Sequence, residues 1–304
     1  MTVVDAGPAN EFGGPEDLEQ AAAIFADLRP RLFGIAYRML GSSTEAEDLV
    51  QDVWLRWQTY DRGTVANPAA FLATATTRLA INAARSARIR RETYIGPWLP
   101  EPVDTGADPH LGAERDEALG FAVLLLLERL SPNERAAYVL REAFDYPYQQ
   151  IAEIIQLSKA TVRQLVSRAR KHVLAERRAP VTDAEQRRLL KAFVSAARSG
   201  DLTALEEILA EDVTSYSDGG GVVRASRIPV VGASRVAKYH KAFAAPFWAG
   251  VEVRWANLNG QASALLCRDG AVFAVLTVNA SAQGIDQVLW MMNPAKLAAA
   301  SAAT

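Results

Sequence analysis

Apolar residues recur at intervals of three and four through residues 24–91, which is the spacing of one face of a helix. The pattern predicts three helices, the first of which ends at Gly41, because glycine readily takes the backbone conformation that ends a helix. Gly, Asn and Pro in residues 61–68 predict a loop after the second helix. The third helix is predicted over residues 69–91, and its second half is basic.

Residues 94–113 interrupt this pattern. Several prolines fall in the segment, and each removes a backbone donor and favours extended geometry, so we expect a linker. Trp98 and Leu99 are large apolar residues that a solvated spacer would not need. We therefore expect both side chains to pack against another part of the chain.

Helical periodicity returns at Glu114 and continues to residue 178. Ser131, Pro132 and Glu134 have the order of a capped helix start, with the glutamate closing a capping box. Residues 148–173 then predict a helix-turn-helix, in which a short amphipathic helix, a two-residue turn and a longer basic helix follow one another.

The longer helix of this pair has an apolar stripe and a basic stripe. Val162, Val166 and Ala169 would anchor it on the first helix, and the Ser158 hydroxyl would cap its start. Residues 147–178 hold seven Lys or Arg against two Glu, a local excess that is typical of phosphate binding. The pattern suits a helix laid in a major groove, and the alternative is a solvated basic helix in an ordinary bundle.

Beyond Asp183 the pattern changes from helical to mixed. Two helical stretches precede short runs of strand composition, separated by turn signals such as Asn259-Gly260 and Asp269-Gly270. A further helix is predicted near residues 234–243. Helices packed on one face of a curved antiparallel sheet would give an α+β fold. Residues 183–304 hold 12 basic and 11 acidic residues, so no nucleic-acid footprint appears here.

Composition narrows the class of protein. The chain has 304 residues and a formal charge of −2, so DNA affinity has to come from local patches. A single cysteine, Cys267, excludes an internal disulfide framework and fits a reducing compartment. No apolar run approaches the roughly 20 residues that span a bilayer. The acidic N-terminus lacks the features of a signal peptide. We expect a cytoplasmic protein that does not insert into a membrane.

The order of these segments resembles that of bacterial extracytoplasmic-function sigma factors, in which a flexible linker joins two helical domains. Residues 46–57 look like the family's segment that binds the clamp helices of the RNA polymerase β′ subunit. Residues 71–91 look like its helix that reads the minus-ten element, and the helix-turn-helix looks like its reader of the minus-thirty-five element.

Three short motifs narrow the resemblance to the subgroup that carries a C-terminal SnoaL-like domain. They are WLPEP at 98–102, DGGG at 218–221 and NPAKL at 293–297. The chain departs from the usual motifs at Val222, which follows the glycines, and at Ala295. These departures concern the details of regulation and leave the expected fold unchanged.

The resemblance implies a multidomain fold, with two all-α sigma domains, the second containing the helix-turn-helix, before an α+β SnoaL-like (NTF2-like) cone. The expected parts are a flexible tail over 1–20, a region 2 domain over 21–93, the linker over 94–113, a region 4 domain over 114–178 and a SnoaL-like regulatory domain over 183–304. The implied function is to direct RNA polymerase to specific promoters, with activity modulated by the C-terminal domain.

The candidate DNA contacts form two sets. Because opening a promoter unstacks bases, loop 61–68 and Phe71 are expected to capture a base, Asn82 to read a base edge, and the arginines to hold phosphates. For Asn82 the alternative is a solvated helix residue. The minus-ten set is Asn67, Phe71, Arg78, Asn82, Arg85 and Arg88. The minus-thirty-five set is Ser158, Lys159, Thr161, Arg163, Gln164, Ser167, Arg168, Arg170 and Lys171.

Two further sets follow from the resemblance. The residues expected to bind the polymerase are Asp48, Leu49, Gln51, Asp52, Trp54 and Leu55. The residues expected to make regulatory contacts are Trp98, Leu99, Pro100, Glu101, Pro102, Asp218, Gly219, Gly220, Gly221, Asn293, Pro294, Lys296 and Leu297. We expect the WLPEP motif to dock on the other two motifs, the alternative being that it only packs on a neighbouring helix. The expected partners are core RNA polymerase, through the β′ clamp helices and the β flap, and promoter DNA; the free chain is expected to be a monomer.

Enzymatic activity is the alternative class of function. SnoaL-like folds include cyclases and isomerases, and the candidate groups here are Asp218, His240, Cys267 and Asp286. No nucleophile–base pair is visible, and no spacing supports a metal site or a cofactor, so we expect no catalysis. A small ligand in the cone is more plausible, because such cones are concave and apolar. The runner-up function is a DNA-tethered enzyme or a sensor of small molecules.

Overall fold

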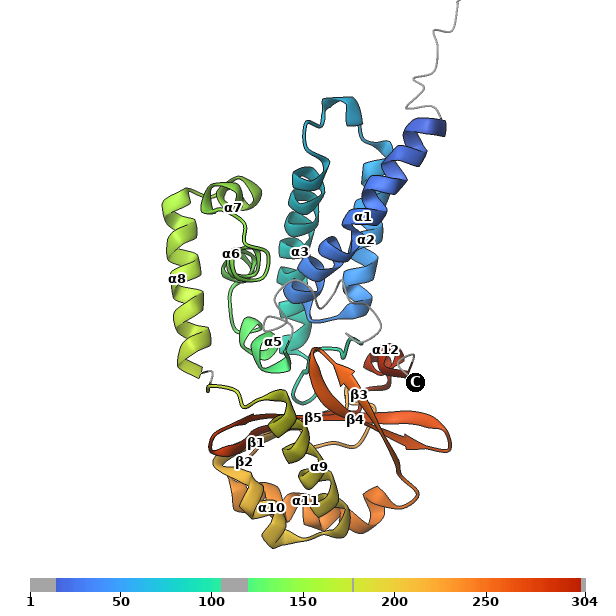
Figure 1. Ribbon diagram of the computed structural model, residues 1–304, viewed down its shortest axis with the longest axis vertical. Coiled ribbons are helices and arrows are strands. Elements are labelled where there is room, and N and C mark those ends of the chain that lie inside the picture. The colour runs from blue at the N-terminus through green and yellow to red at the C-terminus, as the bar shows by residue number, and fades with distance from the viewer. Residues whose placement is uncertain (1–14, 105–119, 177, 302–304) are drawn as a thin grey trace, which may run out of the picture.

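The computed structural model describes residues 15–104, 120–176 and 178–301, and it places a helical half above a sheet domain (Figure 1). The helical half contains α1 Pro15–Leu40, α2 Ser43–Thr59, η1 Arg62–Thr64, α3 Pro68–Glu92, α5 Phe121–Leu127, α6 Pro132–Glu142, α7 Tyr148–Ile155 and α8 Lys159–Glu176. The predicted helix over 69–91 and the end of the first helix at Gly41 are confirmed.

Helix α1 begins earlier than expected. The tail was predicted over 1–20, but α1 starts at Pro15, and residues 1–14 lie outside the described ranges. The early start is stabilised by packing, because Ala21 is buried and its carbonyl accepts a hydrogen bond of 3.2 Å from Trp57 Nε1 of α2. Asp17 also forms an ion pair with Arg62. Tertiary contacts therefore extend a helix that local sequence did not mark.

The helix-turn-helix forms as predicted. Gln156 takes the left-handed conformation (φ 57°) that ends α7, and Thr161 N donates to Ser158 Oγ at the start of α8. Ser131 and Glu134 form the capping box of α6. One continuous hydrophobic core runs through α1–α3 and α6–α8, so the two helical domains pack against each other.

The C-terminal part is a mixed sheet with helices on one face. Its elements are α9 Asp183–Ser199, α10 Leu202–Ile208, β1 Leu209–Asp218, β2 Val230–Val231, α11 Ala233–Trp248, β3 Glu252–Leu258, β4 Gln261–Arg268, β5 Ala271–Ser281, β6 Gly284–Met291, η3 Pro294–Lys296 and α12 Ala298–Ser301. The strand order is β2-β1-β6-β5-β4-β3. The expected antiparallel sheet was wrong at one pair, since β1 and β6 run parallel. The chain between them passes through α11 and the hairpins, and such a crossover allows parallel pairing.

The two Gly-containing turns form tight hairpins. Asn259-Gly260 and Asp269-Gly270 have positive φ at both central residues, which is the type I′ geometry that suits twisted strands. Residues 222–231 have strand composition, but only Val230 and Val231 pair with β1. Proline at 229 has no N–H for a sheet ladder, and the N–H groups of Val222 and Val223 donate to the carbonyl of Gly219 in the preceding turn.

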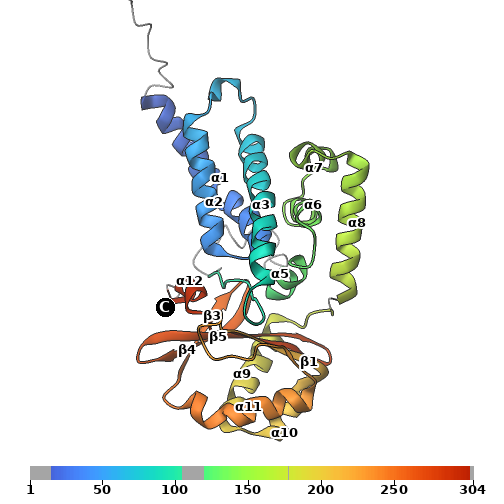
Figure 2. The same cartoon turned by 180° about the vertical axis from the view of Figure 1, so that it is seen from behind.

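The two faces of the sheet are used differently (Figure 2). Helices α9–α11 cover one face and bury Phe193, Trp248 and Trp290. The other face packs against the linker and α5, where Leu99 and Phe121 join strand residues in a second core. No helix within the described ranges combines the length and apolar character that crossing a membrane requires.

Candidate functional site

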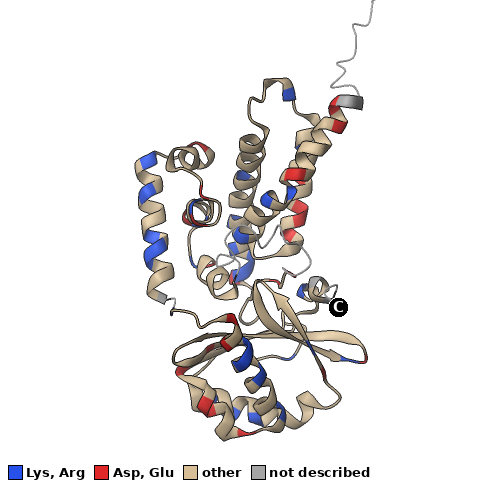
Figure 3. Cartoon of the chain, viewed as in Figure 1, with Lys and Arg blue, Asp and Glu red and all other residues tan. Residues whose placement is uncertain are grey.

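Helix α8 carries Lys and Arg along its length (Figure 3), and these residues are exposed while the apolar stripe is buried. Val162, Val166 and Ala169 are fully buried and fix the rotation of the helix. The nine predicted minus-thirty-five residues are exposed, except Thr161, which is half-buried. Arg163 lies over the ring of Tyr148, 5.7 Å from its centroid, whereas Arg170 donates twice to Glu142 at 2.7 and 3.0 Å. Arg168 lies 3.4 Å from Glu134. The predicted face is thus continuous, and two of its arginines have acidic neighbours on α6.

The predicted minus-ten residues are spread along α3. Asn67 caps the helix, and Phe71 packs on Tyr60 with centroids 4.5 Å apart. Asn82 is exposed and accepts a long contact from Arg85, and Arg88 is exposed near the far end of the helix. At 1.5 Å per residue, the set extends over roughly 30 Å along the helix, so its members cannot all contact the same nucleotide.

Arg78 is tied to the helix-turn-helix. Its Nε donates to the carbonyl of Ile154 at 2.8 Å, and its Nη2 donates to that of Glu153 at 3.1 Å. These carbonyls end α7, where a helix has unpaired acceptors and a partial negative charge. Two hydrogen bonds from Arg78 therefore join the predicted minus-ten helix directly to the helix-turn-helix.

The predicted polymerase surface lies on α2, next to a groove of about 400 Å³ between α1 and α2. Asp48, Gln51 and Asp52 are exposed, and Trp54 packs on Phe25 at the groove, with ring centroids 5.0 Å apart. Leu55 is 52% exposed.

Leu49 does not belong to that surface. It is only 6% exposed and lies in the core between the helices. The reason is periodicity, because positions 46, 49, 50, 53 and 57 form the buried stripe of α2. Asp48, Gln51, Asp52, Trp54 and Leu55 remain on the accessible side.

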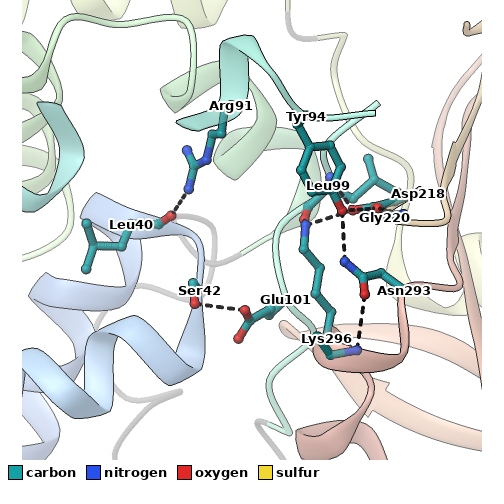
Figure 4. A network of polar contacts seen from close by, with 11 residues as sticks. Leu40, Ser42, Arg91, Tyr94, Leu99, Glu101, Asp218, Gly220, Asn293 and Lys296 are labelled. Atoms are coloured by element: carbon teal, nitrogen blue, oxygen red, sulfur yellow. Dashed lines mark hydrogen bonds and ion pairs between the residues drawn. The ribbon is translucent and has the colours of Figure 1, made fainter. Parts of the chain in front are cut away.

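The three short motifs meet at a buried carboxylate (Figure 4). Asp218 is fully buried; its Oδ2 accepts from the backbone N–H of Leu99 at 2.9 Å and from Lys296 Nζ at 2.7 Å. Lys296 also donates to the carbonyl of Leu99 at 2.6 Å. The other oxygen, Oδ1, accepts from Tyr94 Oη at 2.5 Å. Burial lowers the pKa of the Lys296 ammonium to about 8, and its partners hold the group in place.

Glu101 fixes the linker to the other side, on the start of α2. Its carboxylate accepts from Ser42 Oγ and Ser43 Oγ, both at 2.8 Å, and from the backbone N–H of Thr44 at 3.1 Å. A carboxylate at a helix N-terminus satisfies free N–H groups and meets the positive end of the helix dipole. Pro100 and Pro102 are both buried beside it, so this part of the linker is held rather than solvated.

Two cations lie over the ring of Trp98. The Arg91 guanidinium is 3.5 Å from its ring centroid and Lys296 Nζ is 4.1 Å from it, an arrangement that favours cation–π attraction. Beside this contact Gly41 has φ +65°, and a Cβ there would lie 2.7 Å from the Trp98 ring. The Trp98 side chain is thus enclosed by α3, the α1–α2 turn and the last motif.

The remaining motif residues shape the turn and the last segment. Gly220 has φ +62°, and a Cβ on it would lie 2.5 Å from Asn293 Nδ2. Asn293 donates to Tyr94 Oη at 2.9 Å and caps η3. Leu297 is buried, whereas Pro294 is exposed and makes no buried contact. Gly219 and Gly221 complete the turn; a Cβ on Gly219 would lie 2.4 Å from the carbonyl oxygen of Val223, and a Cβ on Gly221 would meet the exposed side chain of Ile95.

Three residues of this junction were missed by the sequence analysis. Tyr94 joins Asp218 and Asn293, as described above. Tyr37 Oη donates to the carbonyl of Glu101 at 2.7 Å and accepts from Asn259 Nδ2 at 2.6 Å, while Asn259 Oδ1 accepts from Val103 N. In the sequence Asn259 indicates only a turn, and Tyr37 has no feature that indicates a polar contact. Only the tertiary structure shows that the two residues together hold the linker.

The candidate catalytic groups do not converge. Asp218 is fully engaged by the linker, and Cys267 is buried in the core on the linker side of the sheet. His240 packs on the other side against Trp290, with ring centroids 5.4 Å apart, and burial lowers its pKa to about 3. Asp286 pairs with Arg178 at the edge of the molecule. Within the described ranges no group of three or more His, Cys, Asp or Glu side chains could hold a metal ion.

Comparison with known families defines the class. Residues 24–90 match the family "Sigma-70 region 2", and residues 120–173 match the family "Sigma-70, region 4". The two matched ranges hold the α1–α3 bundle and the helix-turn-helix. These are the domains of a factor that directs RNA polymerase to promoters.

Relatives and solved structures identify the family. The ECF RNA polymerase sigma factor SigJ of Mycobacterium tuberculosis is 39% identical over 220 residues, covering 71% of this chain and 70% of SigJ. The probable ECF sigma factor SigI of the same organism is 37% identical over 213 residues, covering 68% and 71%. The crystal structure of M. tuberculosis SigJ superposes with a TM-score of 0.73 at 30% identity, covering 91% of this chain and 98% of that one. The chain belongs to the ECF RNA polymerase sigma factors, and it carries the C-terminal SnoaL-like domain of the SigJ type.

Proposed function

We propose that the C-terminal domain of this sigma factor holds it in a closed form that must open before transcription starts. The observation that carries this proposal is the engagement of the linker by Asp218 on one side and the seating of Glu101 on α2 on the other. The linker joins the two DNA-reading domains, so contacts that hold part of it restrict how far the domains can separate.

In the closed form the two DNA-reading domains lie too close together to contact both promoter elements at once. Elements at minus ten and minus thirty-five lie about 25 base pairs apart, which is about 85 Å of duplex at 3.4 Å per base pair. Arg78 of α3 instead reaches the last carbonyls of α7 within 3.1 Å. Both elements are read at once only after α3 and α7 separate, so release of the linker favours promoter binding.

The surface of α2 stays accessible in the closed form. Asp48 and Asp52 lie one turn apart beside the groove that Trp54 lines. This supports a first encounter with the polymerase through α2, at basic residues of its clamp helices, before the domains separate. We further propose that α8 reads the minus-thirty-five element, that loop 61–68 and Phe71 capture a base near minus ten, and that the factor acts in the cytoplasm.

The C-terminal domain is proposed to act through its contacts with the linker, without catalysis. The dispersal of its candidate catalytic groups supports this, and the Ser215 hydroxyl that lies 3.4 Å from His240 Nε2 is buried with it, away from solvent. The aromatic packing around His240 leaves the interior of the cone to protein side chains, which argues against a ligand there.

Run-off transcription with core polymerase tests the proposal. Asp218→Asn leaves Lys296 buried without its charge partner and should raise run-off product several-fold over the wild type. Lys296→Met should act in the same direction. Asp269→Asn, in an exposed hairpin turn that tolerates asparagine, is the control and should leave the yield unchanged. Lower transcription from both junction variants would mean that the domain holds a productive spacing, and the closed-form proposal would fail.

A further inference from the structure

A pocket of about 630 Å³ lies where the three folded parts of the chain meet. Its walls come from the end of α3, residues 96–98 of the linker, the turn after α5, the start of α6 and the loop before β2. Its basic side chains are Arg88, Arg91, Arg129, Arg135 and Arg227. Figure 3 shows Lys and Arg colouring at the sheet-facing end of α3. We call this the junction pocket.

The junction pocket has more positive charge than its own acids balance. Arg129 has a further interaction of its own, so four arginines face two glutamates, Glu92 and Glu128, which leaves a formal excess of two positive charges. Glu128 already serves two guanidinium groups, pairing with Arg91 and, at 2.6 Å, with Arg135. Within the described residues neither Arg88 nor Arg227 forms an ion pair.

Arg135 shows the imbalance most clearly. The residue is 4% exposed, its Nη1 donates to Met39 O at 2.7 Å, and its Nε is buried without a hydrogen-bond partner. Burial and the charge of Arg88 lower the pKa of Arg135 to about 9, and burial and the charge of Arg135 lower that of Arg91 to about 9. Both groups stay charged at neutral pH, so an anion in the pocket would relieve their mutual repulsion.

We propose that the junction pocket binds a small phosphorylated organic molecule of the nucleotide class. Guanidinium groups form paired hydrogen bonds to phosphate oxygens, and several converge here. The half-buried side chains of Leu125, Leu126 and Tyr216 add an apolar wall for a ring system. The volume of about 630 Å³ lies within the range of small-ligand sites.

The ligand would stabilise the closed form. The pocket is complete only when α3, the linker and the loop before β2 are together; a Cβ placed on Gly96 of the linker would lie 3.7 Å from Arg227 Cα. A molecule bound to all of them favours the assembled state over the separated one. This effect on transcription rests on the proposed function, whereas binding itself does not.

Calorimetric titration of the full-length chain tests binding, with ATP and inorganic pyrophosphate as probes. Both should bind saturably with one site, ATP more tightly because of the apolar wall. Arg227→Ala should weaken ATP binding at least tenfold, because it removes one of the guanidinium groups that would bind phosphate. Arg227 is exposed, so its replacement should leave the core of the protein intact. Arg224→Ala, in the same loop but outside the pocket, is the matched control and should bind as the wild type does.

Three outcomes would overturn the assignment. The first is no saturable heat with either probe at millimolar concentration. The second is an equal loss of binding in Arg224→Ala and Arg227→Ala, which indicates diffuse surface charge. The third is that Arg227→Ala weakens the binding of a non-promoter DNA duplex and leaves both probes unaffected, which would assign the phosphates to nucleic acid. Because no polymerase is present, failure here is distinct from failure of the closed-form proposal.

Discussion

His240 is a buried imidazole whose charge state couples the C-terminal domain to pH. It packs against Phe193 and Trp290, and burial lowers its pKa from 6.5 to about 3. The unfolded chain therefore binds one more proton than the folded chain between these two values, and stability falls as the pH drops below about 6.5.

The expected loss from this group is about 2 kcal/mol at pH 5, from 1.36 kcal/mol per pKa unit. Urea unfolding at pH 7.5 and at pH 5 measures it. His240→Leu should show a smaller decrease between the two pH values than the wild type, because the side chain no longer titrates. Equal decreases in the two proteins would show that other groups cause the acid sensitivity.

Gly220 tests how tightly the DGGG turn is packed. Gly220→Ala forces an alanine into a left-handed conformation, which costs about 1 kcal/mol, and adds a clash with Asn293 worth a further 1–3 kcal/mol or so. Gly250→Ala is the matched control, with φ +67° but no atom within 4 Å of the added Cβ. Thermal unfolding should show the larger loss at Gly220, and equal losses would contradict the crowding around Asn293.

At the scale of elements, helix α8 should separate base reading from phosphate binding. Arg163→Ala should cost about 1–3 kcal/mol on the cognate minus-thirty-five element and relax preference at one position, if it contacts a guanine edge. Lys171→Ala should weaken all sequences alike and reduce the salt dependence of binding by about one charge. Fluorescence anisotropy on cognate and scrambled duplexes measures both. Equal loss on both duplexes for Arg163→Ala would remove its base-reading role.

Helix α2 should carry the polymerase contact through its exposed acids. Replacing Asp48 and Asp52 with lysine should abolish association with core enzyme, because the charges face solvent and not the core. A pull-down measures association, and circular dichroism checks that helix content is unchanged. The control replaces Glu206 and Glu207, exposed on α10, with lysine and should still associate.

At the scale of the whole molecule, the junction should set the overall size. A compact chain of this length has a radius of gyration of about 19 Å. Asp218→Asn should increase the value measured by small-angle scattering by several ångströms, since the freed linker lets the DNA-reading domains separate. The Asp269→Asn control should scatter like the wild type. An unchanged radius in Asp218→Asn would show that α3 and α7 hold the closed form without the linker.

Much of this architecture could be predicted from the sequence, because local rules decide it. The spacing of apolar residues placed α3 and the helix-turn-helix, and Ser131 with Glu134 marked the start of α6. Two Gly-containing pairs placed both hairpin turns. Each of these signals lies within a few residues of the structure that it determines. The family resemblance then supplied the sites that such signals do not reveal, including the contact among the three motifs.

Tertiary structure decided the rest, because the partners are far apart in sequence. Asp218 became a buried anchor through Leu99 and Lys296, and Arg78 became a contact between domains through carbonyls of α7. Leu49 turned out to be a core residue, since one residue of phase on a helix separates the buried stripe from the exposed one. The junction pocket depends on the meeting of three separately folded parts. Nothing in the sequence around each arginine marks it as part of a pocket, and the positive charge is concentrated only because the fold brings these arginines together.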